Sequence, residues 1–545
     1  MLDLSFVSHF LSGLVFGGIL AWAVNLLVIQ PLFDPLRKLP GPGASYFQSH
    51  LSDVTDPDLS ATFHEQQRKN HGKTFKIQGF GRHDLRLMSF DLRVVSHVLT
   101  SPVYEKPWQT RSLLSSILGR GIFTMEGAEH DFQRKIISPA FTTQSVKALV
   151  PVFLQKAEEM RDKWDEMLSS TGMIASDAVK APTIDVSHWI ARATFDAFGL
   201  ACLNYNFGAL QGETEEVYLA FRRMFDMLSK KTVPRILFPS LDKIMPDVVA
   251  RTVTDGLNTI YKAGQNLVRE KKESIGYEKQ DYSKDLLSLL IKSNLSTDPS
   301  KSLSDTDLLD QITSFLFAGS DSTALSLSWC LHFLSLNPNI QSQLRDELAH
   351  PTTPISPSSK VMAFSECESA SFDGYPLLDA VVRESLRLCP PVHATIRVAT
   401  QDDLIRISEP VVLTDGTVIG AGESIAIRKG SFIHIPIEGL NFSTDIWGTD
   451  ALEFRPERWM NTSTPTFPGL ANVMTFSYGP HSCPGYKFTI AEMKAFLITL
   501  LPHFRFSPVE GQRIGKYNGI LVRPFVKGRL QDGLQLPLKV ERFEG

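Results

Sequence analysis

FSYGPHSCPG, residues 476–485, surrounds a single cysteine with two glycines and two prolines. A turn alone does not require Cys483, and a buried structural cysteine does not require such a loop. The run that follows, KFTIAEMKAFLITLL, has the apolar spacing of a helix. The partial positive charge at the N-terminus of that helix favours a thiolate at Cys483, and the thiolate is the form of cysteine that binds metals.

The bulk composition narrows the class of protein. The chain has 545 residues, a net charge of −4, 43% hydrophobic and 21% charged residues, which is typical of a globular protein. The absence of a basic excess argues against a nucleic-acid partner. The five cysteines are widely spaced and form no CxxC motif, which argues against a structural zinc site or a disulfide scaffold and favours a reducing compartment.

The N-terminal segment predicts a membrane anchor. Residues 4–33 carry no formal charge, and about 20 apolar residues suffice to cross a bilayer as a helix. Arg37 and Lys38 follow the run, so the bulk of the chain is expected in the cytosol. A cleaved signal peptide and a buried apolar helix are the alternatives. We expect an anchor at 1–36, a proline-rich hinge at 37–50 and one domain at 51–545.

The rest of the chain indicates a domain that is mainly α with small β-sheets (α+β). Residues 74–100 predict two strands around a glycine-rich turn, followed by a helix, and residues 130–345 are mostly helical in period. Short β-like runs return at 398–436, with a turn at Asp415-Gly416. Residues 350–373 are polar and predict a surface insertion, and GLQLPLKV near the end predicts a hairpin.

The segment 311–344 contains one formally charged residue, Asp321. Ser304 and Asp307 predict a capping box before it, and Asn337-Pro338 predicts its end. We expect a buried central helix rather than a second transmembrane span. A buried acid is costly unless it is paired or functional. The small pair Ala318-Gly319 would let a ligand approach the backbone, although a solvated notch in a core helix explains the pattern equally well.

A charged triad is predicted further along the chain. Glu384 and Arg387 are three residues apart on a strongly periodic helix and therefore share one face. Arg458, in FRPERW, could join them in a buried ion network that fixes the fold more than it stabilises it. The alternative is ordinary surface charge.

A haem iron held by one thiolate fits the cysteine loop, because Gly479 and Gly485 let the backbone approach a flat ligand and Phe476 packs near the sulfur. At this point the chain resembles a membrane-bound cytochrome P-450, of a fungal biosynthetic type, over nearly its whole length. FSYGPHSCPG resembles the cysteine loop of that family, ESLR its Glu-x-x-Arg helix, PERW the segment of the partner arginine, and AGSDST its oxygen-activation helix.

The resemblance implies a P-450 fold behind a single transmembrane helix and a haem-thiolate catalytic domain at 51–545. It assigns catalytic roles to Asp321, Ser322 and Thr323, although the family usually has threonine where this chain has Ser322. It assigns Glu384, Arg387 and Arg458 to a structural network. It assigns contacts with haem b (iron-protoporphyrin IX) to His130, Arg134, Arg397, Phe476, Gly479, His481, Cys483 and Gly485, with Cys483 as the iron ligand.

The activity implied by the resemblance is monooxygenation of an apolar small molecule, terpenoid or steroid-like, with O₂ and with electrons from NADPH. No dinucleotide fingerprint is present, so an NADPH-dependent reductase is the expected partner, in the endoplasmic reticulum membrane. Substrate choice is expected at 101–118, 205–245 and 314–323. The rival hypotheses are a haem-thiolate isomerase or dehydratase, and a non-catalytic haem-binding protein.

Overall fold

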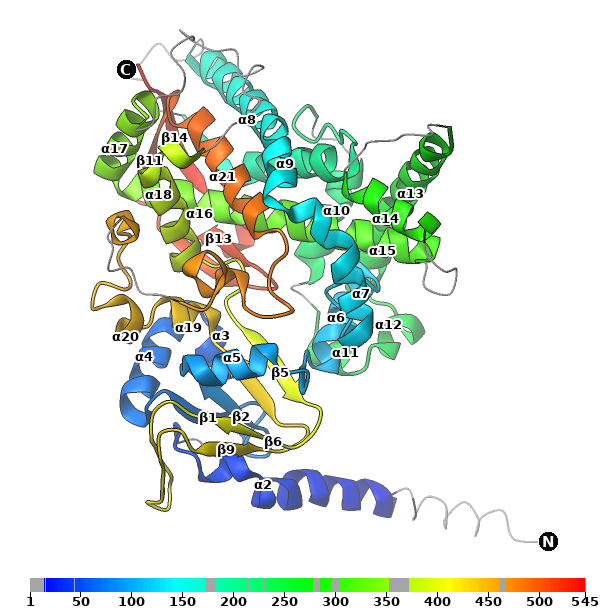
Figure 1. Ribbon diagram of the computed structural model, residues 1–545, viewed down its shortest axis with the longest axis vertical. Helices are drawn as coiled ribbons and strands as arrows, with labels where there is room; N and C mark the ends of the chain where they lie inside the picture. The colour runs from blue at the N-terminus through cyan, green and yellow to red at the C-terminus, as the bar shows by residue number, and fades with distance from the viewer. Residues whose placement is uncertain are drawn as a thin grey trace, which may run out of the picture. The chain divides into compact units, whose positions relative to one another are not determined.

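The computed structural model describes residue 14 and residues 16–43, 45–172, 182–212, 216–228, 231–277, 285–296, 303–351, 372–460 and 467–544. Most of the insertion predicted at 350–373 lies outside these residues. The chain divides into two compact units (Figure 1), which we call unit 1 (Met1–Pro107 and Ala394–Gly448) and unit 2 (Trp108–His393 and Thr449–Gly545). The anchor, hinge and catalytic domain proposed from the sequence stay a prediction.

Unit 1 contains a five-stranded sheet of order β1-β2-β10-β5-β3. The predicted strand–turn–strand–helix of residues 74–100 is confirmed as an antiparallel β1–β2 pair followed by a helix. β10 lies parallel to β2 and antiparallel to β5. The strands of the sheet are β1 (Thr74–Gln78), β2 (Leu85–Ser89), β3 (Tyr104–Glu105), β5 (Thr395–Ala399) and β10 (Phe432–Ile435).

The remainder of unit 1 consists of short strand pairs and helices. The predicted turn at Asp415-Gly416 joins two of these strands, and Gly416 has φ +85°, which suits glycine. The strand pairs are β6 (Asp403–Arg406) with β9 (Ser424–Ile427), and β7 (Val411–Val412) with β8 (Val418–Ile419). The helices are α2 (Gln30–Phe33), α3 (Leu51–Thr55), α4 (Ser60–His71), α5 (Leu92–Thr100), α19 (Ile437–Asn441) and α20 (Thr444–Trp447).

One helix among the described residues, Phe16–Phe33, is long and apolar enough to cross a membrane. Its apolar side chains are exposed, including Phe16, Trp22 and Phe33. This matches the apolar run seen in the sequence, and the membrane anchor stays a prediction based on the length and composition of the helix.

Unit 2 is predominantly helical, as expected for residues 130–345 (Figure 1). Its helices are α6 (Trp108–Leu118), α7 (Gly127–Ile137), α8 (Thr143–Gly172), α9 (Val186–Phe198), α10 (Glu216–Leu228), α11 (Val233–Leu237), α12 (Ser240–Ile244), α13 (Val248–Tyr277), α14 (Leu286–Ser296), α15 (Asp305–Leu316), α16 (Ser322–Leu336), α17 (Pro338–Ala349), α18 (Pro376–Leu388) and α21 (Tyr486–Leu500).

α15 and α16 form the central helix of unit 2, joined by a π-turn, η6 (Phe317–Asp321). The predicted capping box is confirmed: Ser304 Oγ accepts from Asp307 N at 3.1 Å, and Asp307 Oδ2 accepts from Ser304 N at 2.9 Å. The helix ends at Leu336, before Asn337-Pro338, as predicted. α16 packs against α9, α18 and α21 and is buried on almost all sides, so it is a core helix rather than a membrane span.

The strands of unit 2 correct one prediction. GLQLPLKV does not form a local hairpin, because its strand β14 (Pro537–Arg542) lies between β11 (Phe504–Pro508) and β4 (Thr183–Asp185), both distant in sequence. Burial of Leu538 and Val540 decides this pairing, and local turn chemistry does not. The hairpin of the C-terminal region lies earlier, between β12 (Ile514–Asn518) and β13 (Val522–Val526).

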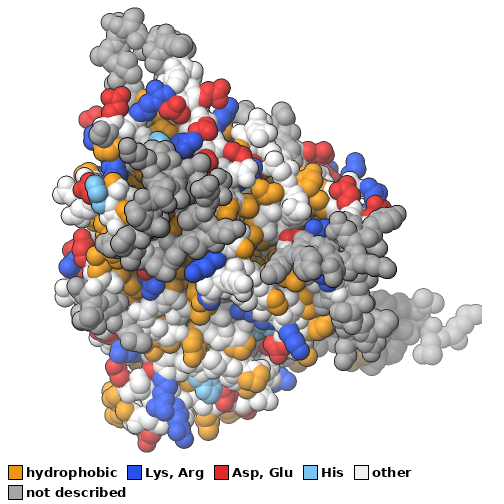
Figure 2. Space-filling model, turned by 45° about the horizontal axis from the view of Figure 1, so that its top comes forward, with side chains coloured by type: hydrophobic (Ala, Val, Ile, Leu, Met, Phe, Trp, Pro, Cys, Tyr) orange, Lys and Arg blue, Asp and Glu red, His pale blue; other side chains and the backbone are white. Residues whose placement is uncertain are grey.

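On the face shown in Figure 2, the coloured Lys and Arg side chains are interspersed with Asp and Glu side chains. This mixed surface is what the small net charge of −4 leads one to expect.

Candidate functional site

The loop that carries Cys483 is closed on itself by backbone hydrogen bonds. Cys483 N donates to Phe476 O at 2.9 Å, and Ser482 N donates to Gly479 O at 3.0 Å. Gly479 has φ +77°, a left-handed conformation that glycine adopts without cost. The loop therefore presents Cys483 at a set position, three residues before α21 begins at Tyr486.

Ser477 is a site residue that the sequence did not point to. It has φ +60° and ψ −168°, a region of backbone conformation that is essentially restricted to glycine. Its amide donates to Met474 O at 2.8 Å, which holds it in this conformation. The loop thus contains one strained non-glycine residue directly after Phe476.

The environment of the Cys483 thiol contains opposing electrostatic effects. Burial raises its pKa to about 11, while the Gly485 amide that donates to the sulfur and the nearby Arg134 guanidinium act to lower it. Burial thus opposes the thiolate form, whereas these two contacts favour it. A metal would displace the proton and would then gain from the same two favourable contacts.

Three residues of α7 and its N-cap fasten this helix to the loop. Arg134 Nη1 donates to Ser482 O at 2.6 Å. The rings of His130 and His481 lie with centroids 3.9 Å apart and their planes tilted by 35°, and His481 Nε2 lies 3.0 Å from Glu126 Oε2. The structure therefore brings His130, Arg134 and His481 together around the loop. Glu126 was not expected from the sequence, since no motif includes it.

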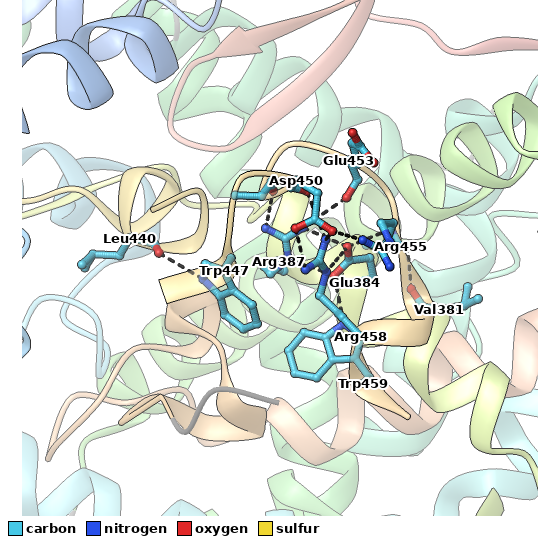
Figure 3. Close-up of polar contacts among 12 residues, drawn as sticks. Val381, Glu384, Arg387, Leu440, Trp447, Asp450, Glu453, Arg455, Arg458 and Trp459 are labelled. Carbon is cyan, nitrogen blue, oxygen red and sulfur yellow. Dashed lines mark hydrogen bonds and ion pairs between the residues drawn. The ribbon is translucent and has the colours of Figure 1, made fainter. Parts of the chain in front are cut away.

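The predicted ion network lies in the core of unit 2 (Figure 3). The Glu384 carboxylate is fully buried and accepts from Arg387 Nε and from Arg458 Nε, each at 2.9 Å. Trp459 Nε1 and the Arg455 backbone amide also donate to it, each at 2.9 Å. Sequence reasoning missed these last two donors, which become neighbours only when the PERW segment folds over α18.

Arg387 uses its remaining donors on the backbone. Its Nη1 donates to Ala451 O at 2.6 Å and its Nη2 to Glu453 O at 3.3 Å. The residue before the cysteine loop is held by the same helix, because Thr475 Oγ1 donates to Leu386 O at 2.7 Å. α18 therefore anchors both the segment after residue 449 and the start of the cysteine loop.

The π-turn of the central helix places the three predicted catalytic residues in different environments. Ser322 Oγ donates to Ala318 O at 2.5 Å. Thr323 is fully buried, and its hydroxyl lies 3.2 Å from that of Thr489 on α21. Between residues 311 and 331 only Ala318, Gly319 and Ser322 are partly accessible. Of the two hydroxyls, the one on Ser322 therefore lies on the accessible face.

Asp321 is paired rather than isolated. Arg523 on β13 contacts both carboxylate oxygens, with Nη1 3.2 Å from Oδ1, and Arg222 Nη1 on α10 lies 3.7 Å from Oδ1. Neither arginine was identified from the sequence. At Gly319 a Cβ would lie 1.9 Å from the Phe198 ring, so its missing side chain makes room for Phe198. The approach of a ligand to the backbone of Ala318-Gly319 stays a prediction.

Arg397, another predicted cofactor contact, lies on β5 in unit 1. Its Nη1 donates to Thr395 Oγ1 at 2.7 Å and to Ile396 O at 3.0 Å. Its role toward a cofactor stays a prediction.

The residues of unit 2 fit a haem held by one thiolate. Among the described residues, no group of three or more His, Cys, Asp or Glu side chains could hold a metal ion. A lone thiolate suits a metal that brings its other ligands with it, as haem iron does. A Cβ at Gly485 would meet only the Phe141 ring, at 3.7 Å, so the protein atoms described there leave room beside the cysteine.

Comparisons with known proteins agree with this chemistry. The model of the family described as cytochrome P450 matches residues 39–527. Cytochrome P450 monooxygenase 205 of Postia placenta is 35% identical, covering 96% of both chains, and monooxygenase 128 of the same fungus is 34% identical, covering 99% of both. Cytochrome P450 monooxygenase claO of Ampulloclitocybe clavipes is 32% identical, covering 97% of both.

Arg387→Met tests the ion network. The change keeps an apolar stem but leaves the buried Glu384 carboxylate without its main cation, so we expect a loss of about 3–5 kcal/mol of unfolding free energy. Urea unfolding measures it. Arg383→Met, one turn earlier on α18, removes a part-exposed pair with Asp379 and a cation–π contact with the Trp459 ring, and should lose less than about 2 kcal/mol. Equal losses in the two variants would contradict a special role for the network.

Ser477→Gly tests the strain in the cysteine loop. Glycine adopts the observed conformation freely, so we expect a gain of about 1 kcal/mol in unfolding free energy. Ser477→Ala is the matched control, since alanine keeps the Cβ that causes the strain and should bring no gain. A stabilising alanine variant, or a destabilising glycine variant, would show that the serine hydroxyl matters more than its backbone conformation.

Proposed function

Because this chain belongs to the cytochrome P450 family, we propose that it is a haem-thiolate monooxygenase, which uses NADPH and O₂ to hydroxylate or otherwise oxidise an apolar small molecule. The observation that carries the proposal is Cys483, the lone thiol presented by a closed loop at the start of α21, with an amide and a guanidinium beside its sulfur. The two relatives from Postia placenta are named cytochrome P450 monooxygenases, which supports the reaction class.

In this proposal Cys483 ligates the iron of haem b, and Phe476, Gly479 and Gly485 shape the loop around it. Bound haem supplies the chemistry of dioxygen activation, and the thiolate donates electron density that favours O–O cleavage. Arg134 supplies positive charge, and with His130 and His481 it forms a cationic or hydrogen-bonding edge suited to the haem propionates. We assign Arg397 to the propionates by family resemblance alone.

Ser322 is the proposed proton-holding residue. Its hydroxyl donates to Ala318 O on the accessible face of the helix, and rotation about χ1 would turn it outward toward a ligand. Asp321 lies next to it, and Arg523 orients the Asp321 carboxylate. Thr323 has its hydroxyl against Thr489 and serves to fix α16 on α21.

We further propose a setting for the enzyme. The apolar helix Phe16–Phe33, followed by Arg37 and Lys38, supports a single-pass anchor in the endoplasmic reticulum membrane with a cytosolic catalytic domain. There an NADPH-dependent reductase would supply electrons. Fungal relatives support a role in secondary metabolite biosynthesis. Residues 101–118, 205–245 and 314–323 are the proposed substrate-selecting segments.

Cys483→Ser tests the ligand assignment. The parent protein, reduced and bound to carbon monoxide, should show the strongly red-shifted Soret band of thiolate ligation, and the variant should lose both this band and the activity. Cys202→Ala is the control, because Cys202 is a buried core residue and its replacement should keep the band. Normal turnover by Cys483→Ser would overturn the assignment, and product formation without NADPH would favour an isomerase or dehydratase.

Ser322→Ala and Ser322→Thr test proton delivery. Without the hydroxyl we expect the rate of product formation to fall about 100-fold or more, while NADPH oxidation continues. Threonine keeps the hydroxyl and restricts its rotamers, so Ser322→Thr should match or exceed the parent in product formed per NADPH consumed. Unchanged turnover in the alanine variant would remove Ser322 from the mechanism. A haem carrier without catalysis would show no turnover in any variant.

A further inference from the structure

Unit 2 has a pocket of about 350 Å³ at the C-terminal end of α16. α16 contributes His332 and Leu336, and the segment from the end of β11 to the start of β12 contributes lining residues between positions 508 and 514. Lys527, just after β13, and two residues of β14 complete the described lining. The volume lies at the lower end of the range that is typical of small-molecule sites.

This pocket is separate from the site described above. Ser322 lies at the start of α16 and His332 lies ten residues further along it, which corresponds to about 15 Å along the helix axis. Of the described residues that line the pocket, none belongs to the set assigned to haem or to proton delivery. A molecule held there would therefore be a second ligand and not the substrate of the proposed reaction.

Hydrogen bonds hold the walls of the pocket in place. Trp329 Nε1 on α16 donates to Val522 O on β13 at 3.3 Å, which fixes the helix against the β12–β13 hairpin. Lys527 N donates to Arg513 O at 2.8 Å and closes the base of that hairpin. Gly511 has φ +75°, a left-handed conformation that suits glycine in the turn between β11 and β12. The shape of the pocket is therefore set by the fold.

Two polar atoms of the lining residues lack hydrogen-bond partners. Within the described part of the chain, His332 Nδ1 and Gln512 Oε1 are both buried and unpaired. Burial lowers the pKa of His332 to about 4, so its imidazole is neutral at neutral pH. A buried polar atom without a partner carries a desolvation cost, which a ligand that pairs with it removes. Most of the other lining residues are apolar, and they include Leu336, Ile514 and Leu538.

Arg513 gives the pocket its charge. Arg513 is exposed, and its guanidinium has no ion pair or hydrogen bond with the described residues. Glu510 lies on the same loop, but it is exposed to water and forms no ion pair with Arg513. Lys527 is a second basic residue of the lining, and the described lining contains no Asp or Glu. Because apolar walls beside a positive charge concentrate its field, the pocket favours an anion.

From these observations we propose that the pocket binds a small carboxylate with an apolar body, and that Arg513 holds the carboxylate. The guanidinium can give two parallel hydrogen bonds to the two carboxylate oxygens. The apolar body would lie against Leu336 and Ile514, and polar substituents would pair with the unpaired atoms of His332 and Gln512. A two-chain lipid exceeds the volume of the pocket, so the expected ligand is a water-soluble acid.

Isothermal titration calorimetry on the full-length, haem-loaded protein tests the proposal, with protein-free detergent micelles as the blank. 2-Naphthoate and 4-phenylbutyrate are titrated beside 2-naphthamide and 4-phenylbutyramide, which keep the shape of each acid without its charge. We expect at least one acid to bind more tightly than its amide. Arg513→Met should weaken binding of that acid about 10-fold and leave the affinity for its amide unchanged, because only the acid pairs with the guanidinium.

Two further variants locate the binding. Arg529→Met removes an exposed arginine outside the described lining of the pocket and should leave all affinities unchanged. Val509→Trp adds a large ring to the lining and should weaken binding of the acid and of its amide by about 10-fold or more, because the ring takes the space of the ligand.

Three results would each overturn the inference. The first is that neither acid binds, and the second is that the acids bind no better than their amides. The third is that binding of an acid is insensitive to Arg513→Met or to Val509→Trp, since it would then take place elsewhere on the protein. The carbon monoxide spectrum of each variant shows that it is folded and loaded with haem.

Discussion

The buried Glu384 carboxylate is the interaction on which the core of unit 2 depends. A fully buried carboxylate is tolerated only when it has cations and hydrogen-bond donors in good geometry, and Glu384 has both from Arg387 and Arg458. Because these arginines come from segments some 70 residues apart in the chain, satisfying one charge joins those segments. Arg387 then extends the connection to two backbone carbonyls.

The position of the cysteine loop depends on contacts with this core. Thr475 binds the start of the loop to α18. Arg134 of α7 contacts the backbone of the loop at Ser482, and His130 of α7 packs against His481. Thr489 connects α21, the helix after the loop, to the central helix. Each contact is local and modest, and together they hold a thiol in a strained loop. The rigidity lies in the surrounding helices, so the loop itself can be short and rich in glycine and proline.

Sequence and structure agree where a local pattern determines the outcome. The cysteine loop, the capping box at Ser304 and the grouping of Glu384 with Arg387 follow from residues close together in the chain. The π-turn, the conformation of Ser477 and the arginines around Asp321 could not be predicted, since each depends on packing between distant segments. Asp321 illustrates the limit: the sequence shows that it needs a partner, but only the fold selects Arg222 and Arg523 from the many arginines available.

The π-turn at Phe317–Asp321 has a consequence for how such a helix can diverge. A π-turn is in effect an α-helix with one extra residue, and each residue of an α-helix advances about 100° around its axis. Loss of a single residue here would restore a regular helix with both of its ends still in place. The same event would change which side chains within the turn face each side of the helix, while the flanking helical segments keep their positions. Deletion of one codon at this position would therefore change the side chains that the turn presents to a ligand. The capping box at Ser304 and the end of the helix before Asn337-Pro338 would stay as they are.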